Sequence, residues 1–311
     1  MRYNNPHVGN IRRRLFDVLL WKLGYWGHAE NLMPPPADFV YPKPKKKKTG
    51  PCATWIGHCT FLLQVDGFNL LTDPVFGKRA SPLPFLGPVR RHAPGIELDK
   101  LPKIDCVLIS HNHYDHLEKE TVMALNRKDP QIQWMVPKGV GKWFKRLGVA
   151  HVQELGWWET AKMKNIEFTA VPTQHFSGRS PLDSNRSLWV GWVVKFPKTG
   201  KQLYFCGDTG YNRVDFKKIG KKFGKMDLSL IPIGTYEPLP FMKPVHVDPK
   251  CAVKIHQDVH SKLSLGMHWK TYRLSDEPLD RPPYDLYQAM SKAHLDPSTF
   301  LAVEPGEKVS W

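Results

Sequence analysis

Short apolar runs separated by polar segments fill the chain after residue 51. Two of them, 54–65 and 68–76, flank the turn Asp66-Gly67 and predict a β-hairpin. Further runs occur at 105–110, 132–137, 166–172, 187–196, 202–207, 228–234, 263–268 and 299–304. Helical periodicity predicts helices at about 118–127, 139–147, 213–223, 248–260 and 283–293. Strands that alternate with helices in this way predict an α/β fold.

The first 50 residues have a different pattern from the rest. Apolar residues recur at helical spacing between 10 and 26, with basic residues among them, which predicts an amphipathic helix. The helix is suited either to a lipid interface or to packing on its own domain. A Pro-rich stretch and a lysine run follow, so we divide the chain into an arm, 1–50, and a domain, 51–311. The residues expected to contact membrane or phosphate are Arg12, Arg13, Arg14, Lys45, Lys46, Lys47 and Lys48.

The charge of the chain favours anionic partners. Its 311 residues hold 45 Lys and Arg against 29 Asp and Glu, a formal charge of +16, which attracts phosphates on lipids, nucleic acids or small molecules. The five cysteines are scattered without a CxxC pair, which favours a reducing, intracellular setting. No apolar run is long enough to span a bilayer. We therefore expect a cytoplasmic protein with peripheral membrane association.

The segment His111-Asn112-His113-Tyr114-Asp115-His116 carries the strongest chemical signal. It directly follows the predicted strand 105–110. Imidazole and carboxylate groups are ligands that zinc and related divalent ions accept. Alternation along an extended turn would let His111 and His113 face one ion while Asp115 and His116 face a second.

Four ligands do not complete two sites, and the chain offers more at the ends of other predicted strands. His175, Asp208 and His268 each follow an apolar run, and open α/β sheets bind ligands at the carboxyl ends of their strands. Taken singly, each histidine could be an ordinary core residue and Asp208 a turn residue. As a set they predict two ions, with Asp208 bridging. The expected ligands are His111, His113 and His175 for one ion, and Asp115, His116 and His268 for the other.

The order HxHxDH, then His, Asp and His resembles the metallo-β-lactamase-fold hydrolases. The segments TWIGHCTFLLQVDGFNLLTDP, SHNHYDHLE, QHFSGRS, YFCGDTGY and GMHW resemble the branch that contains the N-acyl-phosphatidylethanolamine-hydrolysing phospholipase D. The resemblance implies an αβ/βα sandwich, in which two facing mixed sheets have helices outside. It also implies two zinc ions, with iron or manganese left open. Asp73 would support a ligating histidine, and His246 would lie near the substrate headgroup.

For function, the resemblance implies hydrolysis of N-acyl-phosphatidylethanolamine to N-acylethanolamine and phosphatidic acid. Water activated at the two zinc ions would be the nucleophile, and Asp208 and His246 would be the catalytic residues. The expected partners are a phospholipid substrate and an anionic membrane surface, with no nucleic acid, and a homodimer stays open. The alternatives are another hydrolase on the same fold, such as a lactonase of the ascorbate-lactone type or a nuclease, or a non-catalytic metal-containing membrane-binding protein.

Overall fold

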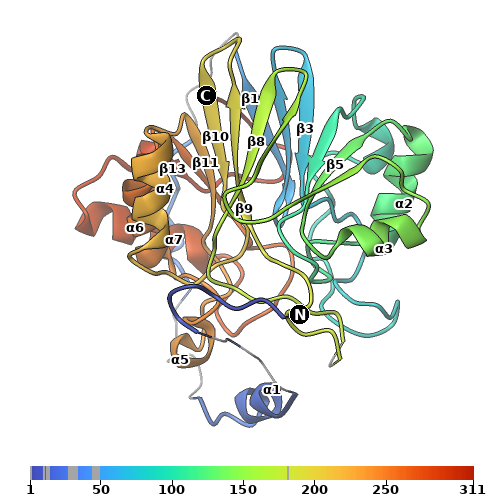
Figure 1. Ribbon diagram of the computed structural model, residues 1–311. Helices are drawn as coiled ribbons and strands as arrows, with labels where there is room; N and C mark the ends of the chain where they lie inside the picture. Colours follow the sequence, from blue (N-terminus) through green and yellow to red (C-terminus); the bar gives the residue numbers. More distant parts are fainter. Residues whose placement is uncertain (1, 10, 12–14, 27–33, 44–49, 181) are drawn as a thin grey trace.

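Two seven-stranded sheets face each other, with helices on their outer sides (Figure 1). The computed structural model describes residues 2–9, 11, 15–26, 34–43, 50–180 and 182–311. This αβ/βα sandwich confirms the predicted fold class.

The first sheet contains the predicted hairpin. Its order is β14 (Lys308–Ser310), β1 (Cys52–Gly57), β2 (Thr60–Val65), β3 (Phe68–Thr72), β4 (Cys106–Leu108), β5 (Gln133–Pro137) and β6 (Val152–Leu155). The strands from β14 to β3 are antiparallel, and those from β3 to β6 are parallel. Helices α2 (Lys119–Lys128) and α3 (Gly141–Arg146) cover the outer face of this sheet (Figure 1).

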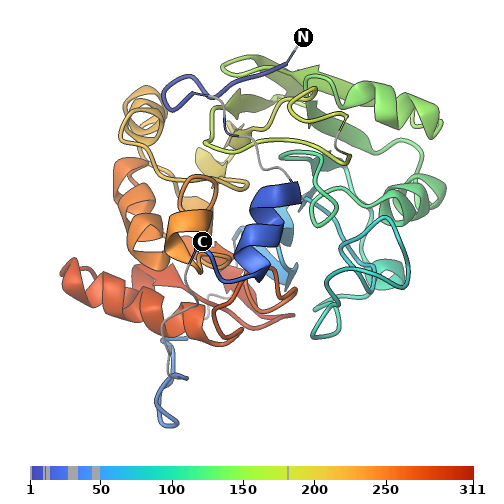
Figure 2. The same ribbon diagram turned by 90° about the horizontal axis from the view of Figure 1, so that it is seen from below.

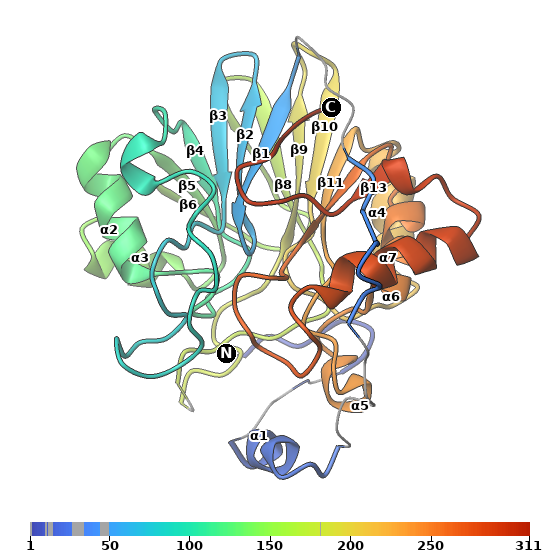
Figure 3. The same cartoon turned by 180° about the vertical axis from the view of Figure 1, so that it is seen from behind.

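The second sheet is parallel on one side and antiparallel on the other. Its order is β13 (Phe300–Leu301), β12 (Ser264–Met267), β11 (Leu228–Pro232), β10 (Lys201–Phe205), β9 (Gly191–Phe196), β8 (Ile166–Val171) and β7 (Thr160–Met163). The strands from β10 to β13 are parallel, and those from β7 to β10 are antiparallel. Helices α4 (Asp215–Phe223), α6 (Pro249–Asp258) and α7 (Arg281–Lys292) lie outside it (Figure 3).

Most strands are buried on both faces, which explains their continuous apolar runs. In β1, Ala53 and Trp55 belong to the core between the sheets, whereas Ile56 packs in the core under α2 and α3. The indole of Trp55 stacks on Trp269 with ring centroids 5.2 Å apart. Successive side chains on a strand point to opposite faces, so one short run supplies two cores.

Some elements differ from the sequence prediction. The run 187–196 becomes a strand only from Gly191. Strands β6, β7 and β14 were not predicted, because their sequences, VQEL, TAKM and KVS, are short and partly exposed. Such strands are defined by pairing with a neighbour rather than by their own hydrophobic pattern.

The described part of the first 50 residues packs on the rest of the chain. Helix α1 (Leu15–Lys22) lies beyond the ends of the sheets, next to α5 (Leu239–Met242) (Figures 1 and 2). Trp21 stacks on Phe241 with ring centroids 5.3 Å apart, and its Nε1 donates to Asp276 Oδ2 at 2.8 Å. No helix in the described ranges has the length and apolar character to cross a bilayer. The basic residues Arg12, Arg13, Arg14, Lys45, Lys46, Lys47 and Lys48 lie outside the described residues.

Candidate metal centre

The predicted ligands meet at one end of the sandwich because the strands that precede them run in the same direction. Within each sheet, β1, β3 and β4, and β8, β10 and β12, are mutually parallel. His58 follows β1, Asp73 follows β3, the segment 111–116 follows β4, and His175, Asp208 and His268 follow β8, β10 and β12. Residues that are far apart in the sequence thus share one buried cluster.

The first group consists of His111, His113 and His175. Nδ1 of His113 lies 2.8 Å from Nε2 of His111 and 3.3 Å from Nε2 of His175. Tetrahedral ligands at the usual zinc–nitrogen distance lie roughly 3.3 Å apart. These three nitrogens therefore have the spacing of ligands to one ion.

The second group consists of Asp115, His116 and His268, with Asp208 beside them. Oδ2 of Asp115 lies 3.2 Å from Nε2 of His116 and 3.4 Å from Nε2 of His268. Oδ2 of Asp208 lies 3.2 Å and 3.0 Å from the same two nitrogens, and 3.8 Å from Nε2 of His175. Asp208 thus lies between the two groups, where the sequence places a bridging ligand.

Hydrogen bonds on the far side of the rings orient the ligating nitrogens. Nδ1 of His116 donates to Oδ2 of Asp73 at 2.7 Å, and Nδ1 of His175 donates to the Val245 carbonyl at 2.9 Å. Each bond fixes the tautomer that leaves a lone pair on Nε2, which is the arrangement found around protein-bound metals. Asp73 is itself fully buried and also accepts from the Ser110 amide at 2.7 Å. The role implied for Asp73 therefore has the matching geometry here.

The donor set fits a divalent cation. Nε2 of His116, Nε2 of His268 and Oδ1 of Asp208 are buried and lack a hydrogen-bond partner among the described residues. Burying such atoms without a partner is costly, and a metal ion removes the cost. Burial also lowers the pKa of His111 and lowers that of His113 to about 4, so both rings are neutral at pH 7. At His116 and His268 the carboxylates of Asp208 and Asp115 outweigh burial: they raise the pKa of His116 and raise that of His268 to about 9, so a metal ion would replace a proton on each of these two rings.

His58 joins the second group, close to the candidate ligands as the segment GHCT predicts, although no catalytic role was expected for it. Its Nε2 lies 2.9 Å from Oδ2 of Asp115, and burial lowers its pKa to about 3.

The backbone around the candidate ligands is left-handed at four residues that are not glycine. These are His58, Asp73, Thr235 and His268, with φ of 53°, 30°, 67° and 61°. Non-glycine residues in this region cost about 1–3 kcal/mol each and cluster at functional sites.

His246 lies at the edge of the cluster and lines a pocket of about 580 Å³. Its Nδ1 is 3.8 Å from Oδ2 of Asp208, and burial lowers its pKa to about 3. The pocket is strongly basic, because its lining includes Arg213, Lys243, Lys250 and Lys254. The structure thus places His246 between the candidate ligands and a surface that attracts anions.

Asn5 contributes to the site although it lies 170 residues before His175, and sequence reasoning missed it. Its Nδ2 donates to the His175 carbonyl at 2.8 Å, and its Oδ1 accepts from the His175 amide at 3.1 Å. The same Oδ1 accepts from Trp189 Nε1 at 3.1 Å. No local pattern around Asn5 could have revealed this, because an isolated asparagine near a turn has many ordinary roles.

Comparison with known proteins agrees with this geometry. Residues 68–269 match the Beta-lactamase superfamily domain, which spans most of the chain. The chain belongs to the β-lactamase superfamily. As a member, it is a metal-dependent hydrolase, which speaks against a non-catalytic role.

Two relatives of this superfamily member share more than the fold. It is 40% identical over 271 residues to the N-acyl-phosphatidylethanolamine-hydrolyzing phospholipase D 1 of Caenorhabditis elegans, covering 84% of this chain and 76% of the relative. It is 38% identical over 229 residues to the mitochondrial N-acyl-phosphatidylethanolamine-hydrolyzing phospholipase D of Saccharomyces cerevisiae. That match covers 72% of this chain and 48% of the yeast protein. The predicted resemblance is confirmed.

Solved structures share the fold of this superfamily member at low identity. The metallo hydrolase Igni18 of Ignicoccus hospitalis superposes with a TM-score of 0.63 at 21% identity, over 84% of this chain and 98% of Igni18. An isothiocyanate hydrolase from Delia radicum gut bacteria superposes with a TM-score of 0.66 at 16% identity, over 84% and 98% of the two chains. At these identities the likeness supports the fold alone.

Proposed function

We propose that this hydrolase cleaves the phosphodiester of N-acyl-phosphatidylethanolamine to give phosphatidic acid and an N-acylethanolamine. The observation that carries the proposal is the basic pocket beside His246, which opens next to the candidate ligands. A phosphodiester is anionic, so the cations of this pocket attract it toward the metal centre. The two relatives named for this reaction, at 40% and 38% identity, support the choice of substrate.

The residues of the two groups would hold two divalent ions, and imidazole and carboxylate ligands favour zinc. Such ions, when bound, act as Lewis acids and lower the pKa of water. Asp208 would accept the proton of the attacking water, because its carboxylate lies between the two groups of candidate ligands, where that water would be held. The water oxygen forms a bond to phosphorus, and the bond from phosphorus to the ethanolamine oxygen breaks.

His246 protonates the leaving oxygen in this proposal. Burial keeps its ring neutral in the free protein, since its pKa is lowered to about 3. A phosphodiester anion in the adjoining pocket favours the charged imidazolium, because opposite charges raise the pKa of a histidine. The bound phosphodiester therefore causes His246 to take up a proton, and His246 then gives this proton to the oxygen of the leaving ethanolamine.

We also propose that the end of the sandwich that carries the centre docks on anionic membranes. Helix α1, the loop 77–90 and the described residues 178–180 and 182–186 all extend beyond this end (Figures 1 and 3). Their large apolar side chains are exposed, with 72% of Leu23, 75% of Phe85 and 78% of Leu182 open to solvent. Apolar side chains on several segments, combined with the net charge of +16, supply the two forces that hold peripheral proteins on anionic lipid.

Mass spectrometry of the products tests the reaction. Purified, zinc-loaded protein is incubated with N-acyl-phosphatidylethanolamine in ¹⁸O-labelled water, beside Asp208→Asn and the exposed control Asp99→Asn. Attack at phosphorus places the label in phosphatidic acid and none in the N-acylethanolamine. We expect activity in the wild type and Asp99→Asn and its loss in Asp208→Asn. If no product forms despite two bound ions per chain, the lipid assignment is wrong, and lactones and nucleic acids become the substrates to test.

Vesicle flotation tests the docking surface. Changing Phe85 and Leu86 to serine removes apolar groups, each worth about 1.5–3 kcal/mol when fully buried. We expect binding to vesicles with anionic lipid to fall at least about tenfold. Val40→Ser is the matched control, because Val40 is as exposed as Phe85 but lies in the segment 34–43, which packs near α7. Equal loss in both variants would contradict the proposed surface.

A further inference from the structure

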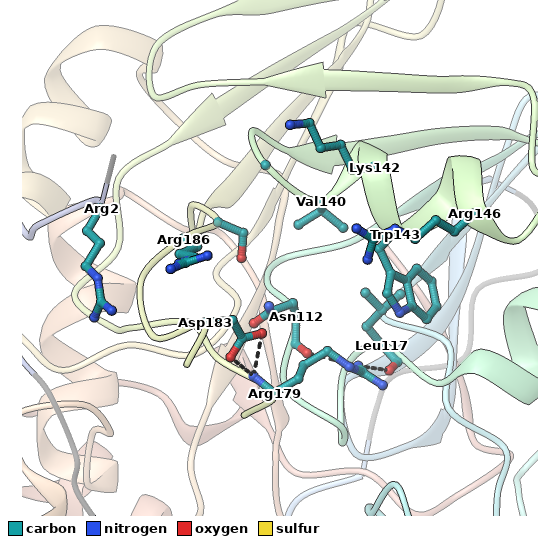
Figure 4. A pocket seen from close by; sticks show the side chains of 12 residues that line it. Arg2, Asn112, Leu117, Val140, Lys142, Trp143, Arg146, Arg179, Asp183 and Arg186 are labelled. Carbon is teal, nitrogen blue, oxygen red and sulfur yellow. Dashed lines mark hydrogen bonds between the residues drawn. The ribbon is translucent and has the colours of Figure 1, made fainter. Parts of the chain in front are cut away.

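A second basic pocket lies beside the metal-binding segment (Figure 4), and His246 is not among its lining residues. Its volume is about 540 Å³, and Asn112 and Leu117, which flank the metal-binding histidines in sequence, form part of its wall. None of the candidate metal ligands lines it, and it shares no lining residue with the pocket of His246. It is therefore a separate site, which neither the proposed reaction nor the comparisons account for.

Cations from several parts of the chain converge on this pocket. Arg2 comes from the N-terminal segment, Arg146 from α3, and Arg186 from the loop before β9; Figure 4 shows Arg2 and Arg186 on one side and Arg146 on the other. With Lys142 and Arg179 the lining holds five positive side chains and one carboxylate, Asp183. This excess of positive charge makes the pocket attractive to a multiply charged anion.

The single carboxylate does not neutralise these cations. The carboxylate of Asp183 accepts hydrogen bonds from the backbone amides of Arg179 at 2.9 Å and Ser180 at 2.7 Å. These bonds stabilise the turn that contains Asp183. Among the described residues, none of the five cations forms an ion pair. Like charges that share a cavity without counter-ions are unfavourable until an anion binds.

Arg179 is held in place before any ligand arrives. Its Nη1 donates to the carbonyls of Asn112 at 3.0 Å and Leu117 at 2.6 Å. Its guanidinium carbon lies 3.9 Å from the centre of the Tyr114 ring and 5.4 Å from that of Trp143. A fixed guanidinium loses little side-chain entropy when it binds an anion. The pocket therefore combines one cation that is held in place, Arg179, with four exposed ones.

We propose that this pocket binds a phosphate monoester group, either as the headgroup of an anionic lipid or as part of a small soluble molecule. A monoester carries close to two negative charges at pH 7 and three acceptor oxygens, which match several guanidinium and ammonium donors at once. The site is independent of the metal centre and of the substrate assigned above. A bound phosphate would lie against Asn112 and Leu117, which belong to the segment that carries His111 and His113.

Chemical modification tests the pocket residue by residue. Metal-loaded protein is treated with phenylglyoxal, which reacts with accessible arginines, and the modified peptides are quantified by mass spectrometry. Millimolar inorganic phosphate is expected to protect Arg146 and Arg186, whereas sodium chloride of equal ionic strength does not. Arg127, which is exposed at the end of α2 and outside the pocket, is the internal reference. Because the readout is local, phosphate bound at the metals does not interfere.

Outcomes with lipid and with variants complete the test. Free phosphate decides whether the site exists, and equal modification of Arg146, Arg186 and Arg127 with and without phosphate would overturn the proposal. Vesicles then distinguish the two sources of phosphate. If phosphatidylcholine vesicles protect Arg146 and Arg186 only when they contain phosphatidic acid, the ligand is a lipid headgroup. If free phosphate protects these arginines and the vesicles do not, the ligand is a soluble molecule. Replacing Arg186 with alanine should weaken phosphate protection of Arg146 about tenfold, while the control Lys145→Ala leaves it unchanged.

Discussion

Replacing Asn5 with alanine should weaken the metal centre from a position outside it. The side chain of Asn5 is buried and makes two hydrogen bonds to the backbone of His175. Alanine would leave the amide and the carbonyl of His175 without partners, at about 1–3 kcal/mol for each buried group. Trp189 loses one acceptor but keeps its bond to the Thr173 carbonyl at 3.1 Å. The expected loss of folding free energy is therefore about 2–6 kcal/mol.

The effect on metal binding follows from the same contacts. His175 can ligate only when its ring is held against His113, and a loosened backbone lets the ring move. Loss of such supporting contacts lowers metal affinity by about 10- to 100-fold. Competition with a chromophoric chelator measures the affinity, and urea unfolding measures the stability. Asn4→Ala is the matched control, because Asn4 is the exposed neighbour. If Asn5→Ala behaves like Asn4→Ala in both assays, the N-terminal segment does not support the centre.

Three further perturbations test other parts of the structure. Asp73→Asn removes the carboxylate that fixes His116 and should lower metal affinity about 10- to 100-fold with an unchanged circular dichroism spectrum; wild-type affinity would contradict this role. Burial lowers the pKa of His256 to about 4, so as the pH falls the unfolded chain takes up this proton before the folded chain does. The free energy of unfolding that His256 contributes is complete above pH 6.5 and should fall by about 2 kcal/mol between pH 7 and pH 5. The variant His256→Gln should lose this part of the pH dependence when unfolding is measured in urea. Chelation of the metals should lower the melting temperature, since ligand at 100 times its dissociation constant contributes about 2.7 kcal/mol; an unchanged temperature would show that the ions are not bound.

The sequence determined the chemistry of the centre because its strongest motif is local. Four of the candidate ligands lie within 111–116, and the others follow short apolar runs that are typical of buried strands. Parallel strands that end at one edge then bring these residues together. The pattern of apolar runs predicted the α/β class, and the resemblance to the metallo-β-lactamase-fold hydrolases implied the αβ/βα sandwich. The five predicted helices are present at slightly shifted bounds.

Only the tertiary structure decided which residues support the centre and which form the second pocket. Asn5 and the Val245 carbonyl form hydrogen bonds with His175 from distant segments of the chain. The second pocket is lined by Arg2, Arg146 and Arg186, which also come from three separate segments. Sequence patterns carry information about periodicity along one element, whereas these contacts depend on how loops between elements are closed. A hydrogen bond between residues that are 170 positions apart, such as Asn5 and His175, produces no recognisable pattern in the sequence around either of them. The chemistry of a candidate ligand is set by its own side chain, which the sequence states directly. The groups that hold the ligand in place depend on how distant segments pack together, which only the folded structure shows.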